Sequence, residues 1–259
     1  MQTINFNATN LTTSSTDPCI FAGSGNSDNP ISVNIGGNVT KIPKYLFSND
    51  TNGTLNIGTI TFKPDDSGNY SCKTIEDYAF RGCAHTRDMW IPKTVTAIGV
   101  SCFGLCKNLT SLTVPFIGKS SAEQGGNTSA SDLRYALGYW FRSASSGVVE
   151  DGFNNTPITC SDGMTVRRLI PKSLTTITIH EDATTTISWG ALRDITSITT
   201  VTLPSTITVL GKNSLAGLTN LKTLNYNIKK LTTTYSTSWY AFSNSGISTG
   251  FDVYFGEEV

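Results

Sequence analysis

The sequence predicts a mostly β protein with short helical segments, built as a solenoid with a parallel β-sheet of about eight rungs and one inserted lobe. Three observations predict this fold: landmark residues recur every 23 positions, apolar residues alternate with Thr in short stretches, and only 15% of the 259 residues are charged. That charged fraction is below the roughly 25% of a typical soluble domain. Thr, Ser, Asn and Gly fill much of the rest, a composition that favours extended β structure over a helical bundle.

The charge pattern argues against two classes of partner. Nineteen basic and nineteen acidic residues cancel, and no block of like charge occurs, so we expect no nucleic-acid binding. No apolar run approaches the roughly 20 residues that cross a bilayer, so we expect no membrane insertion. The first residues lack the basic and apolar regions of a secretory signal. We expect that a leader was removed before this numbering begins, or that the chain reaches its site by assembling onto something else.

The repeat is clearest where two stretches of the chain match position by position. Phe80 and Cys83 recur 23 residues later as Phe103 and Cys106, and the strand-like M-W-I-P at 89–92 recurs as L-T-V-P. The unit reads L-x-x-L-x-L-P-x-x-V-x-x-I-G-x-x-A-F-x-x-C, and it resembles the BspA-type leucine-rich repeat (LRR) family. Repeats of this length are typical of solenoids. Clear copies lie at 75–92, 95–115, 187–204 and 207–226, and degenerate copies at 39–47 and from Leu231 to Phe242.

Alternation within the repeat assigns its two faces. In Leu112-Thr-Val114 the apolar side chains are expected to point inward and the Thr outward, which is the period of a half-buried strand. One repeat cannot bury its apolar face alone, so neighbouring repeats must stack. With one strand per repeat, about 4.8 Å apart, we expect a single continuous sheet roughly 34 Å long. The predicted rungs are Ile31–Ile35, Ile57–Phe62, Met89–Ile91, Leu109–Val114, Leu174–Ile179, Ile198–Leu203, Leu221–Tyr226 and Asp252–Phe255.

Loss of the period divides the chain into five parts. We expect repeats on both sides of an insertion, with irregular copies at the two ends, because the ends of a solenoid must cover their open edges. The parts are an N-terminal cap or attachment segment (1–32), repeats (33–115), an insertion lobe (116–168), repeats (169–226) and a C-terminal capping repeat (227–259).

The insertion lobe begins with loop chemistry and then shows helical spacing. Apolar residues recur at Leu133, Leu137, Trp140 and Phe141, which predicts a helix with Ser131 or Asp132 as N-cap. Two interpretations are open. The lobe binds a ligand, or it is a structural lobe whose aromatic side chains pack on the solenoid. The candidate binding residues of the lobe are Tyr135, Tyr139 and Trp140.

The reactive side chains point to neither a metal site nor a catalytic site. Cys83 and Cys106 occupy equivalent repeat positions, so we expect both to be buried and to point the same way. The cysteines and His85 lack the paired C-x-x-C spacing of a zinc site, so we expect no metal and no cofactor. No nucleophile elbow, P-loop or H-E-x-x-H motif occurs, so we expect no catalytic residues and no enzymatic activity.

The outward face of the predicted sheet supplies the candidate ligand-binding residues. Thr suits exposed strand positions, but an exposed Trp on an open sheet is costly unless it is covered or used. Trp90 stands between Thr61 and Thr113 on this face, with Asp88 two residues before it. We expect Trp90 to be partly exposed and either shielded by the insertion or used as a contact. The full candidate set is Trp90, Asp88, Thr61, Thr113, Thr178, Thr202, Asn225 and Tyr254.

The resemblance implies surface adhesion and binding of host or matrix molecules. We therefore predict a non-enzymatic recognition or adhesion module that binds a protein or glycan receptor through its sheet face. Its expected location is extracellular, on a cell surface or virion surface. The alternative is a structural, decoration or receptor-binding component of a phage particle, held by its termini to other virion or surface-assembly subunits.

Overall fold

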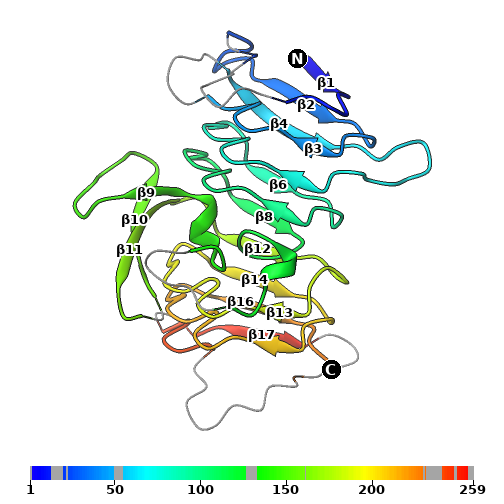
Figure 1. Ribbon diagram of the computed structural model, residues 1–259. Coiled ribbons are helices and arrows are strands. Elements are labelled where there is room, and N and C mark those ends of the chain that lie inside the picture. The colour runs from blue at the N-terminus through cyan, green and yellow to red at the C-terminus, as the bar shows by residue number, and fades with distance from the viewer. Residues whose placement is uncertain are drawn as a thin grey trace.

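A computed structural model describes residues 2–12, 20–21, 23–49, 55–126, 133–160, 162–229, 231, 241–247 and 250–255. The chain winds as a solenoid from one end of the molecule to the other, and the strands of successive coils lie side by side (Figure 1). This confirms the predicted fold class. The strands of the main face are β1 (Thr3–Phe6), β2 (Ile31–Ile35), β4 (Ile57–Phe62), β6 (Asp88–Trp90), β8 (Ser111–Val114), β12 (Thr176–Ile179), β14 (Thr200–Leu203), β16 (Thr223–Tyr226) and β17 (Asp252–Phe255).

All eight predicted rungs are strands, and the structure adds one. Strand β1 lies in the segment that we expected to form an N-terminal cap, and it pairs with β2 in parallel register from Thr3 and Ser32 onward. Its alternating burial places Phe6 in the core. The repeat pattern did not mark this strand, because Thr3–Phe6 is followed by Asn7 and lacks the L-P ending of the repeat unit.

The expectation of one continuous sheet was wrong. The strands form a three-stranded sheet in the order β1-β2-β4 and a six-stranded sheet in the order β6-β8-β12-β14-β16-β17, and no ladder joins β4 to β6. The length of the connection does not explain this interruption, because Thr61 and Trp90 are 29 positions apart and the aligned Asn225 and Tyr254 of the paired strands β16 and β17 are also 29 apart. The hydroxyl of Thr86, rather than a strand N–H, donates to the carbonyl of Ile57, with 3.2 Å between the oxygens.

Short two-residue strands form the second wall of each coil. They are β3 (Lys41–Ile42), β5 (Thr74–Ile75), β7 (Ala97–Ile98), β13 (Thr186–Ile187) and β15 (Val209–Leu210). They pair with one another in parallel, and an isolated antiparallel bridge joins Ala97 to Ser120. Gly99 follows β7 because the backbone of Asp77 in the preceding coil leaves no room for a Cβ atom there.

Equivalent side chains of successive repeats stack in the core. Phe47 lies over Phe80 with ring centroids 5.8 Å apart, and Phe80 lies over Phe103 at 6.3 Å, both with rings 3° from parallel. The thiol of Cys83 donates to the Phe47 carbonyl at 3.5 Å, and that of Cys106 to the Phe80 carbonyl at 3.2 Å. Both cysteines are 1% exposed. The predicted equivalence of the two cysteines is therefore confirmed; Cys19 lies outside the described residues.

The helix predicted in the insertion was wrong in kind. In its place, the described residues from 133 to 141 form a four-residue 3-10 helix, η2 (Leu137–Trp140). Ser131 and Asp132 lie outside the described residues. The backbone explains this difference: the N–H groups of Ser101 and Phe103 donate to the carbonyls of Tyr139 and Trp140, at 2.9 and 3.0 Å. The N–H of Leu137 donates to the carbonyl of Ala191 at 2.8 Å, whereas in an α-helix it would donate to the carbonyl of Leu133. The segment instead bonds to the neighbouring coil, as the turns of regular repeats do. A second short 3-10 turn, η1 (Ser121–Glu123), precedes it.

The sequence did not predict the three antiparallel strands that follow. Strands β9 (Arg142–Ala144), β10 (Phe153–Thr159) and β11 (Thr165–Pro171) form a separate sheet in the order β10-β11-β9. In Figure 1 this sheet stands beside the solenoid. The predicted insertion, 116–168, thus contains a coil of the solenoid up to Phe141 and a projecting sheet after it.

Candidate functional site

A groove lies between the two sheets, where β4 and β6 are not paired. Its volume is about 360 Å³. Four of the eight residues predicted on the sheet face line it: Trp90, Asp88, Thr61 and Thr113. The lining residues are Ile60, Thr61, Phe62, Tyr70, Asp88, Met89, Trp90, Ser111 and Thr113.

Trp90 is held in place by two aromatic neighbours that the sequence analysis missed. Tyr70, from the loop after β4, lies with its ring centroid 5.2 Å from that of Trp90 at an angle of 54°. His180, which follows β12, meets the indole edge-on at 5.3 Å and 87°. Trp90 remains 39% exposed, which confirms the prediction of partial exposure. Its aromatic neighbours come from the solenoid, so the insertion is not what flanks it.

His180 is fixed by a backbone hydrogen bond. Its Nε2–H donates to the carbonyl of Ile91 at 2.8 Å. Burial lowers the pKa of His180 from its usual 6.5, and Lys93 lowers it further, while the bond to Ile91 opposes the shift. The ring is therefore neutral at neutral pH and supports Trp90 as an uncharged aromatic edge.

Asp88 places a carboxylate at the rim of the groove. Its Oδ1 accepts hydrogen bonds from the hydroxyl groups of Ser111, at 2.6 Å, and Thr110, at 3.1 Å. These two bonds fix the carboxylate on the outward face. No hydrogen bond to Oδ2 occurs among the described residues, so this oxygen remains available to a ligand.

Unpaired backbone groups line both sides of the groove. The N–H of Ile91 donates to Thr113 and that of Ser111 to Arg87, so the odd-numbered residues of β6 bond to β8. In a parallel sheet the alternate residues then face the opposite side, which directs the N–H and C=O groups of Asp88 and Trp90 toward β4.

The same reasoning applies to β4. The N–H of Lys63 donates to Ile35 at 2.8 Å, so the odd-numbered residues of this strand bond to β2. The backbone groups of Ile60 and Phe62 therefore face β6. Because both strands are fully described and no backbone bond joins them, these donors and acceptors are open to a ligand or to water.

The rest of the predicted face is in register but lies away from the groove. Trp90 aligns with Thr113, and the line continues through the residues of four further strands. The side chain of Asn225 donates to the hydroxyl of Thr202 at 2.9 Å, which uses part of its polar capacity. The aligned residues beyond Thr113 are Thr178, Thr202, Asn225 and the 56% exposed Tyr254.

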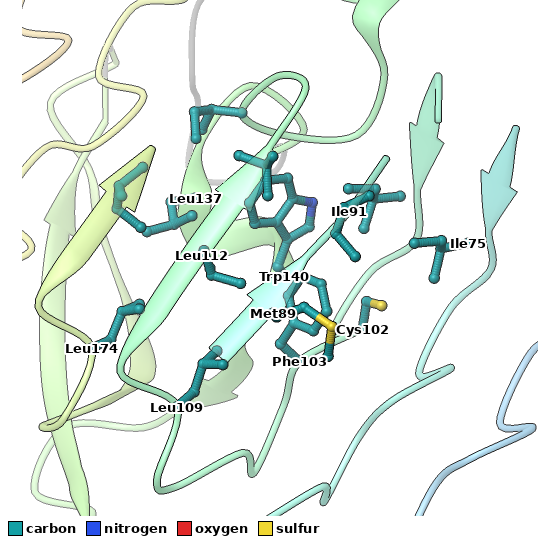
Figure 2. Packing of buried hydrophobic residues seen from close by; sticks show 14 of the residues in the cluster. Ile75, Met89, Ile91, Cys102, Phe103, Leu109, Leu112, Leu137, Trp140 and Leu174 are labelled. Atoms are coloured by element: carbon teal, nitrogen blue, oxygen red, sulfur yellow. The ribbon is translucent and has the colours of Figure 1, made fainter. Parts of the chain in front are cut away.

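Trp140 is a packing residue, contrary to its prediction as a ligand contact in the lobe. It is fully buried, and its Nε1–H donates to the Gly118 carbonyl at 2.9 Å. Its ring meets Phe103 edge-on at 5.9 Å and so extends the Phe stack. Figure 2 shows Trp140 in the buried cluster with Phe103 and Leu137. Tyr135 and Tyr139 are half-buried, and their role in binding stays a prediction.

The groove is lined by groups that can make noncovalent contacts with a ligand. The groove supplies one carboxylate, hydroxyl groups and aromatic rings, and the described part of the chain contains no group of three His, Cys, Asp or Glu residues placed to hold a metal ion. Burial raises the pKa of the Cys72 thiol to about 12 and that of Cys102 well above its usual value. These thiols are protonated at neutral pH and are poor nucleophiles.

No helix among the described residues is long and apolar enough to cross a bilayer.

Comparison with known proteins identifies the repeat. The family model described as "BspA type Leucine rich repeat region" matches residues 2–124 and 171–252, in six copies. A leucine-rich repeat protein of T. pallidum is similar over 83% of this chain and 71% of its own, with 14% identity and a TM-score of 0.33. A leucine-rich cell surface protein of Faecalibacterium prausnitzii A2-165 is similar over 98% of this chain and 83% of its own, with 14% identity and a TM-score of 0.25. No curated protein matches. Because the family model covers most of the sequence, the chain belongs to the BspA-type leucine-rich repeat family.

Proposed function

We propose that the protein is a non-enzymatic recognition module that binds a protein or glycan receptor through the sheet face centred on Trp90. One observation carries this proposal: a partly exposed indole is held between Tyr70 and His180 beside a groove with open polar groups. Trp is enriched among the residues that dominate binding energy. A side chain that is already fixed also loses less entropy on binding.

The proposed setting is extracellular, on a cell surface or a virion surface. The BspA-type repeat supports the cellular setting, because the resemblance to this family implies surface adhesion. The adhesion role rests on the sheet face, because the reactive groups described above offer no alternative chemistry.

The test is binding to an array of immobilised secreted and cell-surface glycoproteins, with the wild type compared with Trp90→Ala. We expect the variant to lose at least about tenfold in apparent affinity, in the range of a binding hot spot. Its melting temperature should change little, since Trp90 is 39% exposed. Met164→Ala is the matched control, because Met164 is an exposed apolar residue in the β10–β11 turn. Unchanged binding of Trp90→Ala, or no binding by the wild type, would refute the proposal.

A further inference from the structure

We infer that the groove between β4 and β6 binds the ring of an uncharged sugar, stacked against Trp90 and Tyr70 and hydrogen-bonded by Asp88 and the open backbone groups. This inference rests on the proposed function and names the ligand class of the same site. Its physical basis is the interruption of the sheet, which places aromatic and polar groups within one hollow.

The aromatic part of the groove suits a ring with apolar faces and polar edges. The rings of Trp90 and Tyr70 pack against each other, with centroids 5.2 Å apart and an angle of 54° between them, so a sugar ring can stack on their outer surfaces. His180 fixes the indole from a third direction at 87°. Aromatic side chains combine a large apolar surface with a fixed geometry, and the C–H groups of a sugar ring present a matching apolar face.

The polar part of the groove demands many donors and acceptors from its ligand. Asp88 and Trp90 on one side, and Ile60 and Phe62 on the other, each present an unpaired N–H and C=O. The free Oδ2 of Asp88 adds an acceptor, and Thr61 adds a hydroxyl. A hydroxyl group both donates and accepts. A ligand with a hydroxyl on most of its ring atoms can therefore satisfy this mixed set, whereas an apolar side chain would leave it unpaired at a cost.

The spacing argues against insertion of a peptide strand. A strand added between β4 and β6 would hold them about 9.6 Å apart, which is twice the usual separation of about 4.8 Å. Cα atoms of β4 and β6 instead come within 8 Å of each other. The two strands are therefore unpaired but too close together for an intervening strand. A ligand must lie over the gap and reach down to it with small polar groups.

The charge of the groove selects among sugars. Asp88 is the sole charged residue of its lining, so the charge carried by the lining itself is negative. Sialic acids and uronic acids would bring a carboxylate close to this group, which is unfavourable because like charges repel. We therefore assign the groove to neutral sugars.

The experiment uses the full chain and two probes. The first is a glycan array that carries neutral and sialylated oligosaccharides, followed by titration of the neutral hits with tryptophan fluorescence as the readout. We expect saturable binding of neutral glycans, and a loss of at least about tenfold for Trp90→Ala, as at other hot spots. Asp88→Asn should lose a similar factor, since it removes the charged acceptor and keeps the side-chain shape.

Asp252→Asn is the matched control. Asp252 aligns with Asp88 along the sheet but lies on the last strand, four strands beyond β8. This variant should bind like the wild type. Thermal melts of all variants separate a loss of contact from a loss of folding, and Asp88→Asn keeps the test decisive if Trp90→Ala is unstable.

The second probe is the glycoprotein array after enzymatic removal of its glycans. Loss of binding on deglycosylation, and competition by the free neutral oligosaccharide, would support the inference. Undiminished Trp90-dependent binding to the deglycosylated proteins would overturn it and leave the proposed function standing, with a protein as ligand. Binding confined to sialylated glycans would also overturn it. If no immobilised glycoprotein or glycan binds in a Trp90-dependent manner, both proposals fail together.

Discussion

At the scale of single residues, the repeat imposes a left-handed backbone conformation at a position where it is unfavourable for residues other than glycine. Gly82 has φ of 78°, and Leu105, its equivalent 23 positions later, has φ of 63°. This left-handed region costs an L-residue roughly 1–2 kcal/mol. The presence of Leu105 shows that the coil sets this conformation even without a glycine. What distinguishes Gly82 is space, because a Cβ there would lie 2.7 Å from the carbonyl oxygen of Asn49.

Gly82→Ala should therefore lower the free energy of unfolding by more than the roughly 1–2 kcal/mol expected for a left-handed alanine. Gly68→Ala is the matched control, since Gly68 has φ of 83° and nothing within 4 Å of its Cβ position. Chemical denaturation of both variants gives the comparison. Equal losses would contradict the contact with Asn49.

His180 makes the stability of the site depend on pH. Burial lowers its folded pKa below 6.5, so below about pH 6.5 the unfolded chain binds a proton that the folded chain does not. The stabilising contribution is complete above that pH and is lost as the pH falls toward the folded pKa. From about pH 7.5 to about pH 5.5, the wild type should lose more unfolding free energy than His180→Gln, which cannot titrate. Parallel urea denaturation curves test this, and identical losses would rule out a His180 contribution.

At the scale of elements, the alternation of apolar and polar residues located the strands, but the sequence did not reveal which strands pair with each other. The strand pattern of 112–114 located β8 and its neighbours, because a half-buried strand must alternate. The antiparallel pair β10 and β11 escaped notice because Asn154, Asn155 and Pro157 interrupt any alternation, and Pro cannot donate to a ladder. Pairing across a sheet is set by the tertiary path, so the gap between β4 and β6 could not be predicted from either strand alone.

The candidate site likewise contains residues that could be predicted from the sequence and residues that could not. Register placed Trp90, Asp88 and Thr113 together, and the structure brings Thr61 to the same groove. Tyr70 and His180 were missed because they lie just outside the repeat pattern, one in a loop and one directly after β12. Their proximity to Trp90 depends on how the coils stack. His180 directly follows the inward-pointing Ile179 at the end of β12. A residue in that position is the sequence signal that could have indicated a neighbour of Trp90.

The segment around η2 behaves as a repeat turn, and Trp140 is its central side chain. Trp140→Ala should destabilise by about 3–5 kcal/mol, the usual cost of emptying a large aromatic site, because the indole is fully buried against Phe103. Trp140→Phe should lose less, since it keeps the ring contact and gives up the hydrogen bond to Gly118. Thermal and urea denaturation measure both. A loss below about 1 kcal/mol for Trp140→Ala would contradict its assignment to the core.

At the scale of the whole molecule, stability is distributed along the stack of coils. In a solenoid each repeat contacts only its neighbours, so its contribution depends on having one on both sides. The inward column of the large sheet illustrates this dependence. Val201 on β14 lies between two strands and is fully buried, whereas Val253 on the last strand, β17, is 40% exposed. The sequence pattern treats the two valines as equivalent, but their positions in the stack differ.

The two valines provide a matched pair, because the same substitution can be made at the same repeat position. Val201→Ala should lower the free energy of unfolding by about 2 kcal/mol, from two lost methyl groups at roughly 0.8 kcal/mol each plus a small cavity term. Val253→Ala should cost less than about 0.5 kcal/mol, as at other exposed sites. Urea denaturation of both variants measures the difference. Equal losses would mean that β17 is packed as closely as the middle of the sheet, and the gradient of burial along the solenoid would have to be abandoned.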